Sequence, residues 1–338
     1  MIQGHGDDTY NYPGIRSNFS SNIYPHADLS ALKAHLCKNM GVIGNYPEPD
    51  AHSLEELIAR KYGVSAANVL ITNGATDAIY LIAQTFSKNT CTYYETGYLP
   101  TFCEYEDACR MFGLKKRAER GSQSSGNTIL WLCNPNNPTG DVYSTEDIAR
   151  YARDYAFVVI DQSYEEYTLA PIMPHQEAAG SENILQLHSL TKTFAIPGLR
   201  IGYVIASEHL IALLRENTRP WAVNALAIEA AKWLIGNDVQ MMSDLRSYLS
   251  ETQRLRGMLN QIEGIIAANT QTHFILSQIT FSTAAQLKAY LARKHHLLIR
   301  DASNICGLSA HHFRVSTQRP DENERLVEGI KEFKQYSF

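Results

Sequence analysis

One lysine in this sequence is surrounded by groups that suit carbonyl chemistry. Lys192 follows the hydroxyl residues Ser189 and Thr191, and Arg200 comes eight residues later, after a Pro-Gly turn that can fold it back. A lysine amine can hold an aldehyde as a Schiff base, and hydroxyls with an arginine are good donors to a phosphate. The segment 189–200 therefore predicts a site for a phosphorylated aldehyde. The plainer alternative is a solvated lysine in a loop.

A second candidate phosphate contact lies in the segment 73–77. It follows the apolar run Val69–Thr72 and opens a predicted helix. Backbone N–H groups of Gly74 and Ala75, with the hydroxyl of Thr76, could bind an anion there. Taken alone, the pattern also fits an ordinary strand-to-helix turn in which Thr76 is a cap.

Two further motifs suit an aromatic nitrogen heterocycle. Asp161 ends the apolar run Phe157–Ile160, where a carboxylate is costly unless it meets a cation, such as a protonated pyridine nitrogen. Tyr164 follows three residues later, and the Pro-rich turn 134–140 can present Asn137, so that both side chains could hydrogen-bond a ring oxygen. Each motif alone also fits a turn or a cap. Together with the lysine segment, they match the needs of pyridoxal 5′-phosphate (PLP).

The elements that must position these groups alternate between short apolar runs and helical stretches. Runs rich in Val and Ile predict the strands of a mostly parallel, buried sheet, at 69–72, 129–133, 157–160, 184–188 and 201–206. Ligands of such sheets bind beyond the carboxyl ends of the strands. The polar motifs stand at those ends.

Helical patterns flank and follow these strands. The first helices are expected at 29–39 and 53–62, the second with Ser53 as a possible cap. One long helix over Asn224–Ile262 would link a large domain to a smaller one. The last third reads as α+β, with strands near 274–278 and 313–316 and helices over 284–295 and 321–336.

Composition limits the class of protein. The chain has 338 residues, 44% of them hydrophobic, and a net charge of −5 with a pI of about 6.2. This balance does not suggest a nucleic-acid or membrane partner. The six cysteines lack metal-site or C-x-x-C spacing, so we expect free thiols, no metal and a cytoplasmic enzyme.

In their order along the chain, these motifs resemble those of the fold-type-I PLP enzymes, the class I and II aminotransferase superfamily. The matching positions are Tyr46, Gly74–Thr76, Phe102, Asn137, Asp161, Lys192 and Arg200. The resemblance implies that Lys192 is the Schiff-base residue and that Asp161 faces the ring nitrogen. It also implies that Phe102 stacks on the ring, with Tyr105 as the second choice.

The resemblance implies an architecture as well. We expect an α/β fold with a large PLP domain over 31–220, built on a mostly parallel sheet of the seven-stranded type. A small α+β domain would follow over 221–338, and the segment 1–30 would pack on the active site. Tyr46 would cross to the neighbouring phosphate, which implies a homodimer with shared active sites.

Several strings are most similar to the threonine-phosphate decarboxylases of cobalamin biosynthesis. They include the His-Gly start, N-F-S-S-N-I at 18–23, A-I-P-G-L-R at 195–200 and L-I-R-D-A-S-N at 298–304. The substrate contacts implied by this resemblance are His5, Gly6, Asn22, Asn137, Arg300 and Arg314. Arg314 would bind the carboxylate, and Arg300 with His5 would help to bind a phosphate.

Two departures leave the reaction open. Asn18 replaces the aspartate usual in that subfamily, and Tyr164 is a feature of histidinol-phosphate aminotransferases. Decarboxylation of O-phospho-L-threonine to (R)-1-aminopropan-2-yl phosphate is therefore the leading hypothesis, and a histidinol-phosphate-type aminotransferase is the alternative. A third alternative is a non-catalytic PLP-binding protein, which the intact lysine, aspartate and arginine set argues against.

Overall fold

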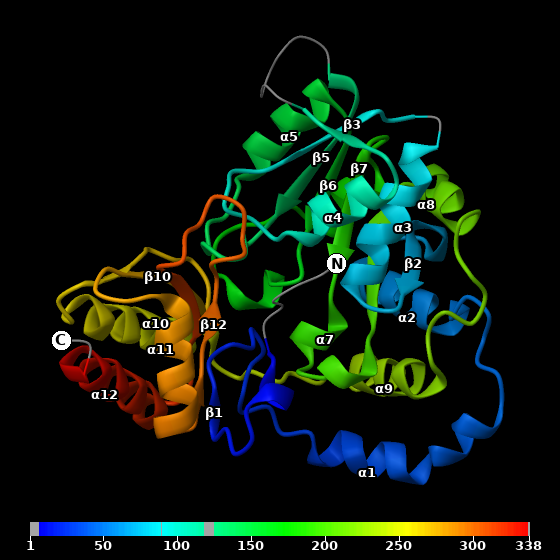
Figure 1. Ribbon diagram of the computed structural model, residues 1–338. Helices are drawn as coiled ribbons and strands as arrows, with labels where there is room; N and C mark the ends of the chain where they lie inside the picture. Colours follow the sequence, from blue (N-terminus) through cyan, green and yellow to red (C-terminus); the bar gives the residue numbers. More distant parts are fainter. Residues whose placement is uncertain (1–6, 89, 118–124, 337–338) are drawn as a thin grey trace.

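A seven-stranded sheet forms the centre of the larger of two units (Figure 1). The structure is a computed structural model that describes residues 7–88, 90–117 and 125–336. The strand order is β2-β8-β7-β6-β5-β3-β4. The strands are β2 (Val69–Thr72), β3 (Tyr93–Thr96), β4 (Lys115–Lys116), β5 (Ser125–Cys133), β6 (Tyr155–Asp161), β7 (Ile184–His188) and β8 (Gly202–Ala206). Strand β8 is antiparallel to both β2 and β7, and the other neighbouring strands of this sheet pair in parallel, which confirms the mostly parallel sheet.

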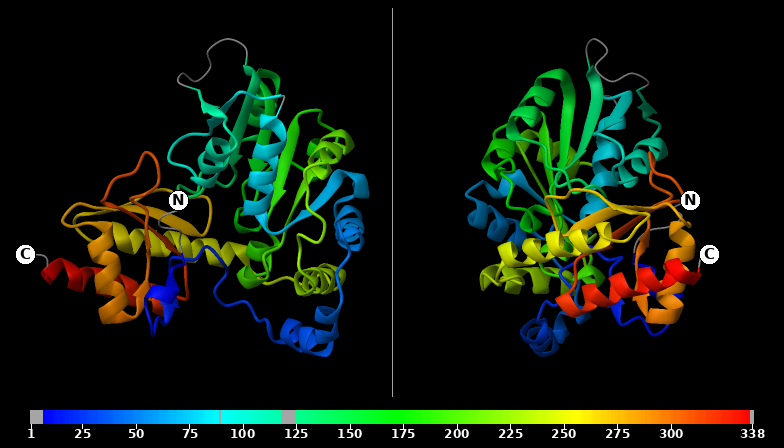
Figure 2. Two further views of the ribbon diagram at one scale, coloured as in Figure 1. Left: turned by 45° about the vertical axis from the view of Figure 1, so that its right-hand side comes forward. Right: turned by 90° about the vertical axis from the view of Figure 1, so that its left-hand side faces the viewer.

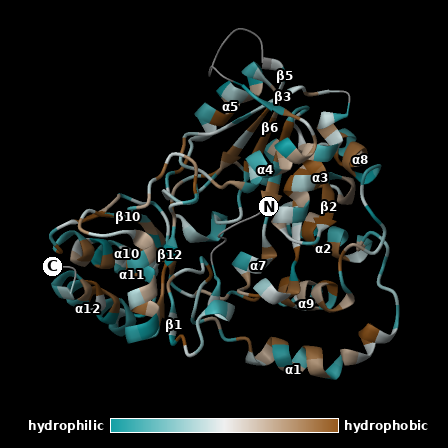
Figure 3. Ribbon diagram, in the orientation of Figure 1, coloured by the Kyte–Doolittle hydropathy of each residue, from teal (hydrophilic) through white to brown (hydrophobic). Residues whose placement is uncertain are grey.

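Alternate residues of these strands enter different cores. Leu70 of β2 packs with helices α3, α4 and α8, whereas Val69 and Ile71 pack with α2 and α9 on the opposite face. The strands, which are largely brown (hydrophobic) in Figure 3, therefore lie between helical layers. The helices of this unit are α1 (Ser30–Lys38), α2 (His52–Tyr62), α3 (Ala75–Ser87), α4 (Glu104–Met111), α5 (Thr145–Asp154), α6 (His175–Ala179), α7 (Leu190–Thr193), α8 (Glu208–Arg215) and α9 (Ala225–Gly236).

The smaller unit contains a four-stranded antiparallel sheet in the order β12-β13-β10-β9. Helices α10, α11 and α12 pack on this sheet (Figure 2). Phe313 and Val315 of β13 enter that core, and Arg314 between them faces the other way, toward the large unit. The elements are α10 (Leu245–Asn260), β9 (Ile265–Ala267), β10 (Phe274–Ile279), α11 (Ala284–Tyr290), β12 (Arg300–Asp301), β13 (His312–Ser316) and α12 (Pro320–Tyr336).

The N-terminal chain lies against the smaller unit. Strand β1 (Ser17–Asn18) pairs in parallel with β11 (Leu297–Leu298), and Phe19 is buried in the core of that unit. Phe19, near the start of the chain, therefore packs in the unit that is built mainly from the C-terminal residues.

Two predictions about helices are wrong. The long helix expected over Asn224–Ile262 is two helices, because the segment 237–244 breaks it and the Asp244 side chain caps α10 by accepting the N–H of Ser247 at 2.9 Å. Helix α2 begins at His52, so Ser53 is not its cap. Helix α9, which follows the boundary expected after residue 220, packs with α1 and α2.

Other expectations agree with the structure. All five strands predicted for the large sheet form, although β3 and β4 of that sheet were missed because neither is a run of Val and Ile. All six cysteines are free. In the part of the chain that the structure describes, no helix has the length and apolarity needed to span a bilayer.

Candidate active site

A pocket of about 230 Å³ lies at the carboxyl ends of the large-sheet strands, between the two units. Its position follows the rule for open α/β sheets. It brings together predicted residues from three parts of the chain: the N-terminal segment, the strand ends and the small sheet. These are Asn22, Ala75, Thr76, Phe102, Asn137, Asp161, Tyr164, Ser189, Thr191, Lys192, Arg200, Arg300 and Arg314.

One end of the pocket collects donors for a phosphate. Gly74 precedes α3 with a φ of +87°, and a Cβ built on it would lie 2.7 Å from Nη2 of Arg200. The guanidinium therefore rests against the start of a 13-residue helix, where free N–H groups favour an anion. The hydroxyls of Ser189 and Thr191 lie 2.7 Å apart at the same pocket. This donor set fits the phosphate of PLP.

Asp161, one of the carboxylates that line the pocket, is buried at the end of β6. Its Oδ1 accepts the N–H of Ser163 at 3.0 Å, and its Oδ2 accepts the hydroxyl of Tyr105 at 2.8 Å. Tyr105, the second choice for ring stacking, is fully buried, stacks on Trp131 and does not line the pocket. Phe102, the first choice for stacking on the cofactor ring, lines the pocket.

Lys192 is half-buried on α7, and its Nζ lies 5.9 Å from the centre of the Tyr164 ring. Burial, with a further effect of the Arg314 and Arg200 charges, lowers the pKa of Lys192 from 10.5 to about 8. A larger share of the amine is therefore neutral, and nucleophilic, than on an exposed lysine. Burial also raises the pKa of Tyr164 to about 12, so its hydroxyl keeps its proton.

Two arginines of the small sheet face the pocket side by side. Arg300 and Arg314 are direct partners across the β12–β13 ladder, and both are buried. Arg314 donates to Oδ1 of Asn137 and, at 2.9 Å, to the carbonyl of Ser20, while Arg300 donates to Oδ1 of Asn304 at 2.7 Å. Like charges directly opposite each other are destabilising, so this pair favours a ligand with anionic groups.

The arginine pair also has spare donor capacity. The Nε of Arg314 is buried and has no hydrogen-bond partner among the described residues. Burial lowers the pKa of both arginines, that of Arg314 to about 10. A buried cation with an unused donor indicates a place for a carboxylate or a phosphate.

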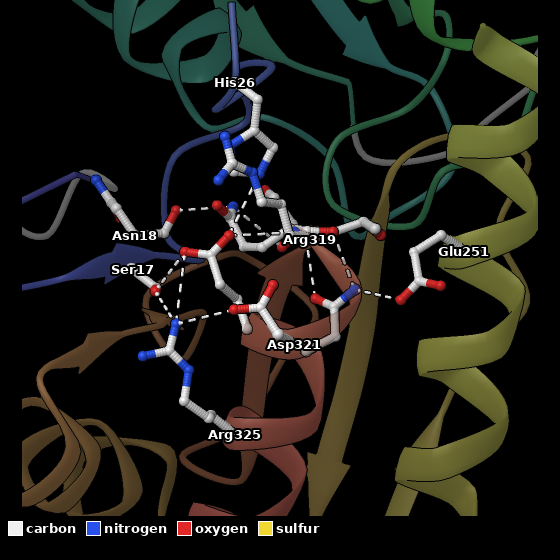
Figure 4. Close-up of polar contacts among 12 residues, drawn as sticks. Ser17, Asn18, His26, Glu251, Arg319, Asp321 and Arg325 are labelled. Carbon is white, nitrogen blue, oxygen red and sulfur yellow. Dashed lines mark hydrogen bonds and ion pairs between the residues drawn. The ribbon is translucent and has the colours of Figure 1, made fainter.

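The N-terminal strap, residues 17–24, closes one side of the pocket. Asn22 donates to the Tyr164 hydroxyl at 3.2 Å and accepts the Ser316 hydroxyl at 2.7 Å, so it touches both units. Ser17 donates to Oε1 of Glu322 at 2.6 Å, which ties the strap to the start of α12 (Figure 4).

Some predicted residues lie elsewhere. Tyr46 is 84% exposed, packs beside Trp221 and does not line the described pocket of its own chain. His5 and Gly6 lie outside the described residues. The pocket also has lining residues that sequence reasoning missed, namely Asp7, Ser20, Ser21, Ile23, Ile79, Cys103, Cys133, Ser163, Pro197 and Ile305. Ser20 and Ser21 lie within the motif 18–23, and Cys133 ends the predicted strand 129–133, so these residues could have been found in segments already singled out.

The fold and this site define the class of protein. The family of class I and II aminotransferases matches residues 16–330, and the chain belongs to it. It is therefore an enzyme of the PLP-dependent class, and pyridoxal 5′-phosphate is its cofactor.

The chain is similar to two kinds of enzyme within this family, decarboxylases and aminotransferases. The chain is similar to the L-threonine-O-3-phosphate decarboxylase of Porphyromonas gingivalis, with 35% identity, a TM-score of 0.88 and coverage of 94% of this chain and 99% of that one. It shares 26% identity with the threonine-phosphate decarboxylase of Salmonella typhimurium, over 93% and 90% of the two chains. A histidinol-phosphate aminotransferase of Caldanaerobacter subterraneus is 28% identical, over 89% of each chain.

Proposed function

We propose that the chain is a threonine-phosphate decarboxylase that converts O-phospho-L-threonine to (R)-1-aminopropan-2-yl phosphate, a reaction of cobalamin biosynthesis. The observation that carries this proposal is the buried pair Arg300 and Arg314 at the pocket, which suits a substrate with both a carboxylate and a phosphate. The names of the decarboxylase relatives support it.

The residues present fit PLP, and each part of it has a group to hold it. We propose that Asp161 pairs with the ring nitrogen, that Asn137 and Tyr164 reach the ring oxygen, and that Phe102 covers a ring face. The phosphate would be held by Gly74, Ala75, Thr76, Ser189, Thr191 and Arg200, with Tyr46 of a second copy. Bound there on Lys192, the cofactor supplies an electron sink for the bond that breaks at the substrate Cα.

The protein contributes orientation and a proton. Arg314 would hold the substrate carboxylate and so fix which bond at Cα lies perpendicular to the cofactor plane. Arg300, with His5 and Gly6, would hold the phosphate, and Asn22 would close the pocket over both. When CO₂ leaves, the bonding electrons stay behind, and Lys192 can deliver the proton that replaces the carboxylate on Cα. Its pKa of about 8 suits a group that both carries and releases a proton near neutral pH.

A histidinol-phosphate-type aminotransferase is the second candidate. Tyr164 at the ring oxygen and the aminotransferase relatives favour it. In that reaction Lys192 would remove the Cα proton, and an oxo acid would be needed to complete turnover. Geometry at Cα decides between the two reactions, because both substrates carry a phosphate.

One assay separates these functions. The holoprotein is mixed with O-phospho-L-threonine without oxo acid, and CO₂ release and product mass are followed. Sustained CO₂ with aminopropanol phosphate is the expected result. Turnover only with histidinol phosphate and 2-oxoglutarate would establish the aminotransferase, and no turnover with either would leave the non-catalytic alternative.

We also propose that two copies form a homodimer in the cytoplasm and share their active sites. The exposed Tyr46 beside Trp221 supports a contact that the single chain leaves open, and the six free thiols suit a reducing compartment. Light scattering gives the mass. Two inactive variants, Tyr46→Ala and Lys192→Ala, should regain activity when their subunits are mixed, because one hybrid site is intact; failure to do so would count against sharing.

A further inference from the structure

We propose that Tyr105 is a positioning residue that controls how strongly Asp161 holds a proton on the cofactor ring nitrogen. This inference rests on the proposed role of Asp161. Tyr105 does not line the pocket, and the sequence motifs offered it only as the second choice for ring stacking, not as a partner of Asp161.

The contact is direct, buried and aimed at the functional carboxylate. The Tyr105 hydroxyl lies 2.8 Å from Oδ2 of Asp161, and the two residues are 0% and 4% exposed. The ring is fixed from two sides, because it stacks on Trp131 at 5.3 Å with an angle of 12° and meets the Phe102 ring edge-on at 5.6 Å. A phenol held in this way has little freedom to turn its hydroxyl elsewhere.

The remaining oxygen of the carboxylate is also held. Oδ1 of Asp161 accepts the backbone N–H of Ser163 at 3.0 Å. With one donor on each oxygen, the carboxylate plane is fixed while it lines the pocket. Burial, followed by the Asp161 charge, raises the pKa of Tyr105 well above its ordinary value, so the phenol keeps the proton that it donates to Oδ2 of Asp161.

The direction of the effect follows from the hydrogen bond. A donor to a carboxylate stabilises its charged form and lowers its affinity for a proton. Removing the phenol hydroxyl should therefore move the shared proton from the ring nitrogen toward Asp161. A less positive ring withdraws electrons less well from the substrate Cα, so the chemical step slows while substrate binding is kept.

The test is Tyr105→Phe, which removes one oxygen and keeps the ring packing. The matched control is Tyr155→Phe, because Tyr155 also donates to a buried carboxylate, Oε2 of Glu95 at 2.7 Å, away from the pocket. Each protein is loaded with PLP carrying ¹⁵N in the ring. The ring-nitrogen chemical shift, kcat, KM and the melting temperature are then measured.

We expect the ring ¹⁵N signal of Tyr105→Phe to move toward that of neutral pyridine, with kcat lowered about tenfold and KM changed less than about twofold. Tyr155→Phe should show a comparable loss of melting temperature and a wild-type ¹⁵N signal. An unmoved ¹⁵N signal in Tyr105→Phe would overturn the inference, even if kcat fell.

The ¹⁵N signal does not depend on which reaction the holoprotein catalyses, so it separates this inference from the proposed function. If decarboxylation failed but the Tyr105→Phe signal moved, the positioning role would stand and the substrate would be wrong. A neutral-pyridine signal in the wild-type protein would overturn the Asp161 assignment and this inference with it.

Discussion

Replacing Arg300 with glutamine gives the sharpest test of how the pocket recognises its substrate. Arg300 is 7% exposed, and its guanidinium is shielded from water, so its contacts with a ligand are little screened. The variant keeps a polar but shorter side chain and removes one of the two buried cations. If Arg300 binds the phosphate and Arg314 the carboxylate, only phosphate recognition should suffer.

The size of the loss follows from the chemistry of the contact. A hydrogen bond to a charged group contributes about 1.5–3 kcal/mol, and each 1.36 kcal/mol is about a factor of ten in rate. We therefore expect kcat/KM for O-phospho-L-threonine to fall about 10-fold to 150-fold. The slow reaction of unphosphorylated L-threonine should change less than about twofold.

The assay compares both substrates on wild type, Arg300→Gln, Arg314→Gln and a control, Arg293→Gln, which removes an exposed charge of the same unit outside the pocket. Arg314→Gln should impair both substrates. Inhibition by inorganic phosphate should weaken with Arg300→Gln in parallel with kcat/KM. An equal loss on threonine and phosphothreonine in Arg300→Gln would refute the assignment of the two arginines.

Three further predictions concern the cofactor, the amine and the strap. Gly74→Ala places a methyl group 2.7 Å from Nη2 of Arg200, at a backbone φ of +87°. The dissociation constant of PLP should therefore rise at least about tenfold. The control Gly198→Ala, whose Cβ would have no atom within 4 Å, should leave this dissociation constant unchanged. The pKa of Lys192 is about 8 in the folded apoprotein and 10.5 when unperturbed. Between these pH values the unfolded chain binds more protons than the folded one, so the free energy of unfolding should rise with pH. Urea unfolding of Lys192→Met should lack that rise, and the same dependence of unfolding free energy on pH in both proteins would contradict the lowered pKa. Glu322→Ala should raise KM several-fold without changing the holoprotein spectrum, because the strap loses the hydrogen bond from Ser17 to α12. Glu324→Ala, on the exposed side of the same helix, should leave KM unchanged. Equal KM values in the two variants would count against a role for the Ser17–Glu322 hydrogen bond.

Much of the site could be predicted because its residues follow strands. Asp161 and Lys192 each stand at or just beyond the carboxyl end of a strand in a parallel sheet, and such ends meet at one edge. The sequence pattern therefore predicts that the Asp161 and Lys192 side chains lie close together. Arg300 and Arg314 were found through resemblance, whereas their cross-strand pairing needed the register of a sheet.

The features that were missed depend on contacts between distant parts of the chain. Tyr105 and Asp161 are 56 residues apart, and no local pattern distinguishes a tyrosine that holds a carboxylate from one that fills a core. The break at 237–244 was misjudged because the apolar periodicity continues on both sides of it, although Asp244 is a normal helix cap. The expected contact of Tyr46 with a phosphate site stays a prediction, because that site belongs to another copy of the chain.

The strap has a consequence for how the protein is made. Its residues are synthesised well before their partners, because Asn22 and Ser20 contact Ser316 and Arg314, each 294 positions later in the chain. The ribosome must therefore deliver nearly the whole chain before the pocket can close. A nascent chain halted before β12 would contain Asp161 and Lys192 but neither Arg300 nor Arg314, so we expect such a fragment to lack the groups that select the substrate.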